Sequence, residues 1–420
     1  MEAVEAFGGG KAALVDVATD GTGMRVACTR RGGVLQVWDR DVATGAVTLT
    51  AQVGGDVARE AEGGAAVAAP AGGAPVGPPP AESLGRVVWA PAEHGAVVAA
   101  ADGGDVRLFA EEEAPRVSAG EEGTAPSSRR PRRWAVIGVL RACPEVTGAS
   151  VLDIAFGPGH LGLLLAAVDD SGWVSVFRAP RVLDHRVWEL HSRFRAFEGV
   201  GVPAAALCWC PRRQEYPFLA VSAGEAGEEV EMEIGEAEDP GQGVARVLAG
   251  RVWACNFNED RDWQAVADLR CATGASRRGN SNASDGGSAG VGSARSDDDD
   301  DDAGGSEEGR DVLCRSMAWS PRTGRKRELI AAAVGTGVQV WGFDLLLCNE
   351  ETGLPEVQGV ASFPACHDSL CRKVSWNAPG DTLASSGDDA RIKLFMEDLE
   401  GGWECVQIFG TEDDGELEMG

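Results

Sequence analysis

Short segments with alternating apolar and polar residues recur along the chain in a fixed order. In each unit an alternating segment comes first, followed by a run of small and apolar residues and then by a turn rich in Asp, Gly or Ser. After the turn comes a segment with β-branched residues that ends on an aromatic residue. Alternation with period two, bounded by such turns, predicts β-strands. The closing segments are Val34–Trp38, Val106–Phe109, Val174–Phe177, Val338–Trp341 and Ile392–Phe395.

The segments before each closing strand predict two further strands in every unit. The first strands are expected at 14–18, 87–90, 151–156, 314–319 and 371–376, and the second at 26–28, 97–101, 163–168, 329–334 and 382–386. An outer strand is marked by Trp134, Trp188, Trp263 and Trp403, and is placed at Val47–Val53 and Val357–Phe363 in the first and fifth units. A sixth unit fits between 204 and 269, with strands at Ala206–Cys210, Phe218–Val221 and Arg251–Phe257.

Six units of four strands predict an all-β fold, a six-bladed WD-repeat β-propeller. Because each blade needs its neighbours to cover both faces, we expect a single domain over 11–410. The blades are placed at 11–53, 85–140, 149–194, 204–269, 312–363 and 370–409. The segments 54–84, 111–132, 223–248 and 272–311 lack apolar periodicity and are predicted to be disordered loop insertions, and 411–420 an acidic tail.

Eight residues are predicted to build the blades and to carry no ligand chemistry. They are Trp38, Asp39, Phe109, Phe177, Trp341, Asp388, Asp389 and Phe395. A polar turn followed by a strand that ends on an aromatic residue is typical of WD-repeat blades. The Asp side chain at such a turn can accept hydrogen bonds from nearby backbone amides.

The motifs that could indicate a small ligand or a metal have a structural explanation. Gly157–Gly162 reads G-x-G-x-x-G, yet a dinucleotide site needs a helix next, and here an apolar strand, Leu163–Val168, follows. Cys208 and Cys210 lie on one face of a strand without a second ligand pair, so they are expected to be buried thiols. Cys366, His367 and Cys371 lack zinc spacing, and His367 is placed in a turn before the last blade. No cofactor and no metal are predicted.

No enzyme motif accounts for the remaining reactive residues. The chain has five histidines, spread over separate blades, and no nucleophile elbow, Walker loop or H-E-x-x-H pattern. Asp297–Asp302 forms a self-repelling run without the spacing of a calcium loop. The Arg129–Arg133 cluster is compatible with a localisation signal or with contact to an acidic partner. The sequence therefore predicts a protein that is not an enzyme.

Charge and apolar segments limit the partners. The chain carries 38 basic and 66 acidic residues, a net charge of −28, which argues against direct binding to nucleic acid. Eight acids lie between Glu225 and Asp239, eight between Asp297 and Glu308 and five between Glu412 and Glu418, so the blades are nearer to neutral. The longest apolar run, Leu161–Val168, is too short to span a bilayer, and the acidic start resembles no secretory signal. The eleven cysteines fit reduced thiols in a cytosolic or nuclear compartment.

Several of these segments resemble a known family, the Seh-type WD-repeat nucleoporins, which are relatives of the Sec-thirteen coat proteins. The third blade carries the resemblance in 156–168 and in Trp173–Pro180 with Trp188. The last blade carries it in 374–389 and in Trp403–Cys405. The pair Ala179-Pro180 favours the Seh branch.

The resemblance implies an open propeller that a partner completes with three strands, as a seventh blade. It implies a scaffold subunit of the nuclear pore outer ring, the Y-complex at the nuclear envelope, bound to an α-solenoid nucleoporin and to other Y-complex subunits. It also implies a role in nucleocytoplasmic transport, including protein and mRNA transport, in pore assembly, and in a coat-like nutrient-signalling complex in the cytoplasm or at lysosomes or vacuoles. Vesicle-coat scaffolding, or peptide recruitment for a ubiquitin ligase across the propeller face, are the alternatives.

The assignment of strands to blades supports the open ring independently of the family. The outer strand of the last blade, Trp403–Phe409, belongs to the last unit itself. No further segment is predicted to form a strand that would join the last blade to the first. Exposed strand edges invite pairing by another chain. We therefore expect partner contacts at the open edge of the first blade, at Leu14, Val15, Asp16, Val17 and Ala18.

Overall fold

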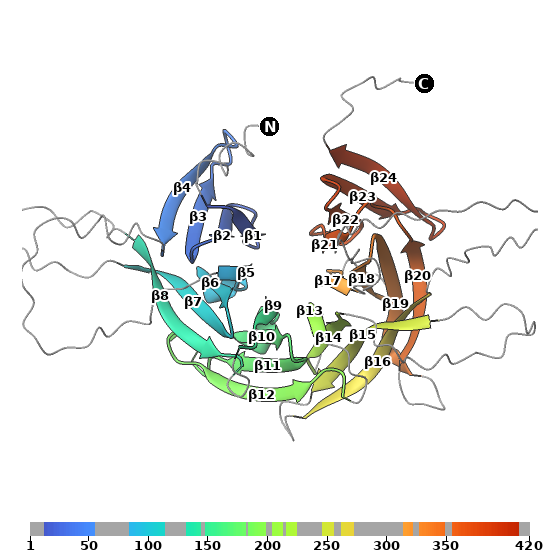
Figure 1. Ribbon diagram of the computed structural model, residues 1–420, viewed down its shortest axis with the longest axis horizontal. Helices are drawn as coiled ribbons and strands as arrows, with labels where there is room; N and C mark the ends of the chain where they lie inside the picture. The colour runs from blue at the N-terminus through green and yellow to red at the C-terminus, as the bar shows by residue number, and fades with distance from the viewer. Residues whose placement is uncertain are drawn as a thin grey trace, which may run out of the picture.

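The structure, a computed structural model, describes residues 12–54, 84–113, 132–143, 148–181, 184–198, 204–212, 216–224, 246–255, 262–272, 314–321, 327–348 and 355–410. In these ranges the chain forms six four-stranded antiparallel sheets arranged around a centre (Figure 1). The prediction of an all-β, six-bladed propeller is confirmed. No helix in the described part of the chain has the length and apolar character needed to cross a membrane.

Each sheet is one blade, with its first strand innermost. Blade one is β1 (Leu14–Thr19), β2 (Arg25–Arg30), β3 (Val34–Arg40) and β4 (Val47–Val53), and blade two is β5 (Leu84–Trp89), β6 (Val97–Asp102), β7 (Asp105–Glu113) and β8 (Arg132–Arg141). Blade three is β9 (Val151–Phe156), β10 (Leu164–Asp169), β11 (Trp173–Arg178) and β12 (Glu189–Arg195). Blade four is β13 (Ala204–Trp209), β14 (Phe218–Ala223), β15 (Arg246–Cys255) and β16 (Trp263–Ala272). Blade five is β17 (Cys314–Trp319), β18 (Glu328–Val334), β19 (Gly337–Cys348) and β20 (Pro355–Phe363), and blade six is β21 (Cys371–Trp376), β22 (Thr382–Gly387), β23 (Arg391–Glu397) and β24 (Trp403–Gly410).

The strands that flank the predicted insertions extend further than the sequence suggested, so the insertions are shorter. Strand β7 continues to Glu113 and β8 begins at Arg132, where Glu111–Glu113 pair with Arg132–Trp134. Likewise β15 begins at Arg246, earlier than the expected 251. Opposite charges on paired residues stabilise the extended part of the β7–β8 hairpin. The sequence does not predict this part as strand because it contains few apolar residues. The central parts of the four predicted insertions, and the tail 411–420, lie outside the described residues.

The glycine-rich segment after β9 is a turn, as predicted. Gly159–Leu161 form a single 3-10 turn, η2, which is followed by β10. Gly162 has φ = 85°, a conformation that glycine adopts at little cost. A matching turn, η1 (Ala92–His94), lies at the same place in blade two. Neither turn has the helix that a dinucleotide site requires.

The core lies between blades. Five clusters of buried apolar side chains each join two consecutive blades, from one–two to five–six. Strand alternation explains how one strand serves two clusters: in β6, Val98 faces blade one and Val97 faces blade three, and both are fully buried. Among the described residues no sixth cluster joins blade six to blade one.

Two hydrogen bonds recur at every second blade junction. In the first, an acceptor at the third residue of an inner strand takes the amide of the next blade: Asp16 from Val87 (3.1 Å), Asp153 from Leu207 (3.0 Å) and Ser316 from Val374 (3.2 Å). In the second, a tryptophan indole donates back to a carbonyl of the preceding blade: Trp89 to Ala18 (3.1 Å), Trp209 to Ala155 (3.0 Å) and Trp376 to Ala318 (3.1 Å). These two bonds from the inner strands therefore mark the junctions one–two, three–four and five–six, while other contacts, such as Trp341 to the Arg270 carbonyl, connect the remaining blades.

Candidate functional site: the junction of the last and first blades

The terminal junction, defined as the facing sheets of blade six (β21–β24) and blade one (β1–β4), differs from the other five junctions. Figure 1 shows the blue first blade and the red last blade on opposite sides of a space. Lys373 of β21 donates to Asp16 Oδ1 at 3.2 Å and to the carbonyl of Val17 at 3.4 Å. Within the described ranges, these are the hydrogen bonds that connect blade six with blade one.

Blade six has an apolar face turned toward this junction. Leu383 and Phe395 pack against blade five and are fully buried. Their neighbours along the strands point to the opposite face because side chains alternate. Ile392, Met396 and Phe409 are accordingly 46%, 38% and 47% exposed. Ile392 and Phe409 are direct cross-strand partners, so the exposed apolar side chains lie side by side.

The facing surface of blade one combines a polar row with an apolar row, Thr19–Val26–Trp38–Leu49, and Leu49 is 45% exposed. Cys28, Gln36 and Gln52 form a cross-strand row in register with Val17. The Gln36 amide donates to Gln52 at 2.8 Å and its oxygen accepts from Arg30 at 2.7 Å. Arg30 and Gln36 are buried, so their polar atoms need these partners. The terminal junction thus has exposed apolar side chains on both walls, and the blade-one wall carries a hydrogen-bonded polar row as well.

The predicted partner-binding residues line the inner end of the blade-one wall. Leu14, Val15 and Val17 are 48%, 45% and 40% exposed, which is unusual for the inner strand of a blade. Asp16 and Ala18 are half-buried, because both serve the junction with blade two. That these five residues contact a partner remains a prediction. The apolar face of blade six was missed, although alternation in Arg-Ile-Lys-Leu-Phe-Met, 391–396, shows apolar residues on both faces.

The predicted blade-building residues occupy structural positions. Phe109, Phe177, Trp341 and Phe395 are at most 4% exposed and belong to the clusters between blades. Trp38 is half-buried in β3, and Asp39 pairs with Arg25 at 3.3 Å. Asp388 forms an ion pair with Arg372 of β21. Asp389 accepts the Arg391 amide at 3.1 Å, which is the turn bond expected of it.

Blade six also assembles a Ser–His–Asp arrangement that the search for nucleophiles missed. His367 Nδ1 lies 2.9 Å from Asp389 Oδ2, and its Nε2 lies 2.7 Å from Ser385 Oγ. His367 and Ser385 are 2% and 1% exposed, so a substrate has no access to the hydroxyl. Burial acts to raise the pKa of Asp389, but amide hydrogen bonds and His367 outweigh it and hold that pKa below its usual value. The trio braces β22, its turn and the loop before β21.

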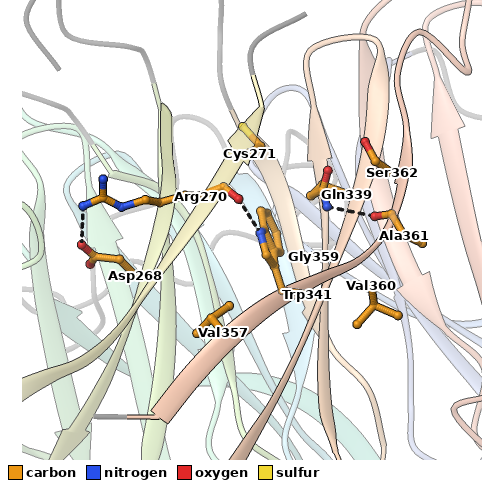
Figure 2. Close-up of a pocket in the computed structure, with 10 residues that line it drawn as sticks. All are labelled: Asp268, Arg270, Cys271, Gln339, Trp341, Val357, Gly359, Val360, Ala361 and Ser362. Atoms are coloured by element: carbon orange, nitrogen blue, oxygen red, sulfur yellow. Dashed lines mark hydrogen bonds and ion pairs between the residues drawn. The ribbon is translucent and has the colours of Figure 1, made fainter. Parts of the chain in front are cut away.

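Two hollows in the described structure have polar groups that are largely used in internal hydrogen bonds. Figure 2 shows the first, of about 330 Å³, between β16 of blade four and β19–β20 of blade five. There Trp341 donates to the Arg270 carbonyl at 2.8 Å, Gln339 donates to the Ala361 carbonyl at 2.9 Å, and Asp268 lies 3.6 Å from Arg270 (Figure 2). These contacts bind two blades together and leave no free charged group to fix a ligand among the residues drawn.

The second hollow, of about 400 Å³, lies where four inner strands end, β1, β5, β9 and β13. Trp89, Phe156 and Trp209 line it together with prolines. Both indole N–H groups already donate to inner-strand carbonyls of the preceding blade. The hollow therefore offers an apolar aromatic surface without a charged side chain among its lining residues.

The described cysteines are all free thiols. Burial raises the pKa of Cys210 and Cys314 to about 12, and it raises that of Cys208 well above the usual value. Such thiols stay protonated and unreactive at neutral pH. Within the described ranges, no three His, Cys, Asp or Glu residues converge on a point where a metal ion could be held.

The proteins to which the chain is similar agree with the resemblance found in the sequence. No family model matches the chain. The chain is 23% identical to Protein SEH1 of Arabidopsis thaliana over 331 residues, which covers 76% of this chain and 79% of that protein. It is 24% identical to Nucleoporin SEH1-A of Xenopus laevis over 332 residues and to Nucleoporin SEH1 of Homo sapiens over 334 residues, in each case 78% of this chain and 72% of the relative. The resemblance to the Seh-type nucleoporins is thereby confirmed.

Among solved structures, the chain is similar to a protein of Bacteroides uniformis provisionally assigned as a 6-phosphogluconolactonase. The TM-score is 0.51 at 14% identity, with 94% of this chain and 84% of that chain covered. At this identity the likeness concerns the fold alone, because propellers carry many unrelated functions.

Proposed function

We propose that the chain is a non-catalytic scaffold subunit of the nuclear pore outer ring, and that the terminal junction binds strands supplied by an α-solenoid nucleoporin. The observation that carries the proposal is the second apolar face of blade six, where Ile392, Met396 and Phe409 are exposed in adjoining strands. A sheet that is apolar on both faces is built to be packed on both sides. The similarity to nucleoporins named SEH1 supplies the biological setting.

The partner is expected to add a blade, packing its sheet face to face against blade six. Complete burial of an Ile, Met or Phe side chain is worth about 1.5–3 kcal/mol, so burying these three half-exposed side chains adds about 3 kcal/mol. The incoming sheet would meet apolar residues on the blade-six side and the Gln36–Gln52 row on the blade-one side. Its face toward blade one should therefore carry polar side chains opposite the Gln36–Gln52 row and apolar side chains opposite Val17 and Leu49.

The wider setting follows the relatives. We place the protein at the nuclear pore in the nuclear envelope, in contact with other Y-complex subunits and without direct contact to nucleic acid or insertion into a membrane. A second role in a coat-like nutrient-signalling complex, in the cytoplasm or at a lysosomal or vacuolar surface, belongs to the same proposal. The described structure supports the absence of catalysis through the buried Ser385 hydroxyl, since the one triad-like arrangement found among the described residues is closed to substrates.

Affinity purification from native cells, followed by mass spectrometry, tests the proposal. The tagged chain should recover outer-ring nucleoporins, and Ile392→Asp should lose them because it buries a charge against the partner. Leu190→Asp is the matched control: Leu190 is 49% exposed on the outer strand of blade three, away from the terminal junction. Recovery of vesicle-coat subunits alone, or of a ubiquitin ligase alone, would overturn the proposal.

The aromatic hollow at the ends of β1, β5, β9 and β13 favours the adaptor as a second candidate function. An adaptor would insert an apolar peptide side chain beside Trp89, Phe156 and Trp209. Its binding should be insensitive to Ile392→Asp, and a short peptide should suffice. The scaffold, in contrast, needs a partner with several strands. The same purification therefore separates the two functions.

A further inference from the structure

We infer that Lys373 exchanges partners when the terminal junction is filled, leaving Asp16 for a carboxylate on the innermost strand of the incoming partner. The inference rests on the proposed function and specifies the chemistry of the segment that binds: a β-strand with an Asp or Glu near its third position. It is carried by the geometry of the inner strands around the ring and by the hydrogen-bond partners of Asp16.

The third residue of an inner strand connects blades in every blade except blade four, where it is Ala206. In blades one, three and five it is an acceptor that takes the next blade's amide, as Asp16 does from Val87. In blade two it is a cation, Arg86, whose Nε lies 3.7 Å from Asp153, the third residue of the next blade. Blade six follows the blade-two arrangement, because its third residue is Lys373. A cation at this position therefore lies beside an acid at the third position of a neighbouring blade: Arg86 is near Asp153 of the following blade and also 3.8 Å from Asp16 of the preceding one.

Lys373 contacts Asp16 because blade one comes after blade six around the ring, on the other side of the terminal junction. Its Nζ lies 3.2 Å from Asp16 Oδ1, and the lysine side chain is 44% exposed. The Asp16 side chain is 11% exposed, but an ion pair whose lysine is this exposed contributes little to stability. The pair is thus easily broken when another sheet enters between the two blades.

Asp16 does not depend on Lys373. Its Oδ2 accepts the Val87 amide at 3.1 Å, and Arg86 Nη1 lies 3.8 Å from its Oδ1. Both contacts lie on the blade-two side, so they persist when the lysine leaves. Lys373, in contrast, needs a new acceptor if a partner sheet covers it, because a covered ammonium without a partner is costly.

A lysine at position 373 is well suited to changing its ion-pair partner. The chain holds 34 arginines and four lysines, Lys11, Lys326, Lys373 and Lys393. The ammonium of lysine is a compact point charge on a flexible stem, whereas the planar guanidinium of arginine holds carboxylates in fixed bidentate geometry. The neighbouring Arg372 shows the contrast, since its Nε and Nη2 both bind Asp388 within blade six. Lys373 can redirect its charge without rearranging the backbone.

Carbodiimide cross-linking with peptide mapping tests the exchange directly. The reagent activates a carboxylate, and a lysine amine in contact with it forms an amide bond. In the purified free chain we expect a Lys373–Asp16 cross-link. In the complex purified with the wild-type chain, that cross-link should fall at least fivefold and a link from Lys373 to an Asp or Glu of the partner should appear. Lys393, which donates to the Cys366 carbonyl, is the internal control and should not change.

The outcomes keep this inference separate from the proposed function. An unchanged Lys373–Asp16 cross-link in a complex that contains the outer-ring partner overturns the exchange and leaves the proposed function intact. A link from Lys373 to a second copy of this chain overturns it as well. Failure to recover any outer-ring partner would instead count against the proposed function.

Substitutions provide the quantitative test. Lys373→Glu should weaken binding of the purified partner at least tenfold, because two carboxylates would then face each other. Replacing the partner's cross-linked acid by Lys should restore binding to Lys373→Glu. Arg372→Ala removes a cation one residue away and should leave the affinity unchanged. Equal losses for Lys373→Glu and Arg372→Ala would contradict a specific role of Lys373, and unfolding curves of the free variants show whether either is misfolded.

Discussion

The two faces of blade six carry the same kind of side chains in different surroundings. On the blade-five face, Leu383 and Phe395 are 0% exposed, and on the opposite face Ile392 and Phe409 are 46% and 47% exposed. The strands alternate apolar residues to both sides, as strands inside a stack of sheets do. Along β23 the difference lies in the neighbour, because Phe395 packs on blade five and Ile392 faces the terminal junction, whereas the outer strand β24 is exposed on both faces.

Blade one shows the complementary case. Its blade-two face contributes Leu35 and Val37 to a buried cluster, whereas its other face carries the Arg30–Gln36–Gln52 hydrogen bonds. The two walls of the terminal junction therefore share exposed apolar side chains, and only the blade-one wall carries this buried row of hydrogen bonds. A second sheet that fits between them needs apolar side chains on both faces and polar side chains opposite Gln36 and Gln52.

The largest expected difference concerns the two faces of blade six. Phe395→Ala should lower the free energy of unfolding by about 3–5 kcal/mol, because it leaves a cavity between blades five and six. Ile392→Ala should lower it by less than about 1 kcal/mol in the free chain, since Ile392 is already half-exposed. Urea unfolding measures both. Equal losses would mean that the face at the terminal junction is packed in the free protein.

A smaller loss is expected from the buried histidine of blade six. His367→Ala leaves Ser385 and Asp389 without this partner and should cost about 1–3 kcal/mol. His94 is the matched control: it is also buried, and among the described residues neither ring nitrogen has a hydrogen-bond partner. In the equivalent turn of blade three the same position is Leu161. His94→Leu should therefore be neutral or stabilising, and a loss equal to that of His367→Ala would contradict the bracing role.

Acid should weaken blade six through Asp389. The pKa of this carboxyl in the folded chain lies below its ordinary value of 3.8, so its contribution to stability is complete above that value. The contribution is lost as the pH falls below about 3.8 and through the folded pKa. Asp389→Asn should reduce this acid dependence, measured as the midpoint of urea unfolding between pH 5 and pH 2.5. An unchanged pH profile in the variant would show that other carboxyls dominate.

The smallest effect concerns thiol reactivity. Cys405 is exposed on β24, whereas Cys314 and Cys371 are buried and burial raises the pKa of each to about 12. Iodoacetamide at pH 8 should modify Cys405 at least tenfold faster than the other two, as measured by peptide mass spectrometry. Comparable rates at Cys371 would indicate that blade six opens readily.

The fold could be predicted from the sequence because blades repeat. The inner strands 151–156, 314–319 and 371–376 and the outer strand 47–53 were placed to the residue, since alternation, turns and aromatic residues agree there. Blade four was placed less well, because a long acidic segment precedes β15 and hid its first five residues. The extended hairpin of β7 and β8 was missed, because its paired charges resemble an insertion when read along the chain.

The candidate site was predicted only in part. The open edge of the first blade indicated Leu14–Ala18 as partner-binding residues. The exposure of Leu14, Val15 and Val17 is consistent with that prediction. The blade-six face could have been derived from the alternation in 391–396. The Lys373–Asp16 pair could not, because the two residues are 357 positions apart and meet only in the folded ring. The His367–Ser385–Asp389 trio was overlooked for the same reason, as its members lie on three separate turns and strands of the blade.

Hydroxyl-radical footprinting of Met396 tests the central claim most directly. The chain has six methionines, and Met396 is 38% exposed on the blade-six face of the terminal junction. Binding of the purified outer-ring partner should slow oxidation of Met396 at least tenfold, whereas buried Met317, at 6% exposure between blades four and five, should react slowly in both states. If Met396 is oxidised at the same rate in the free chain and in the complex, the partner binds elsewhere and the terminal junction is not its site.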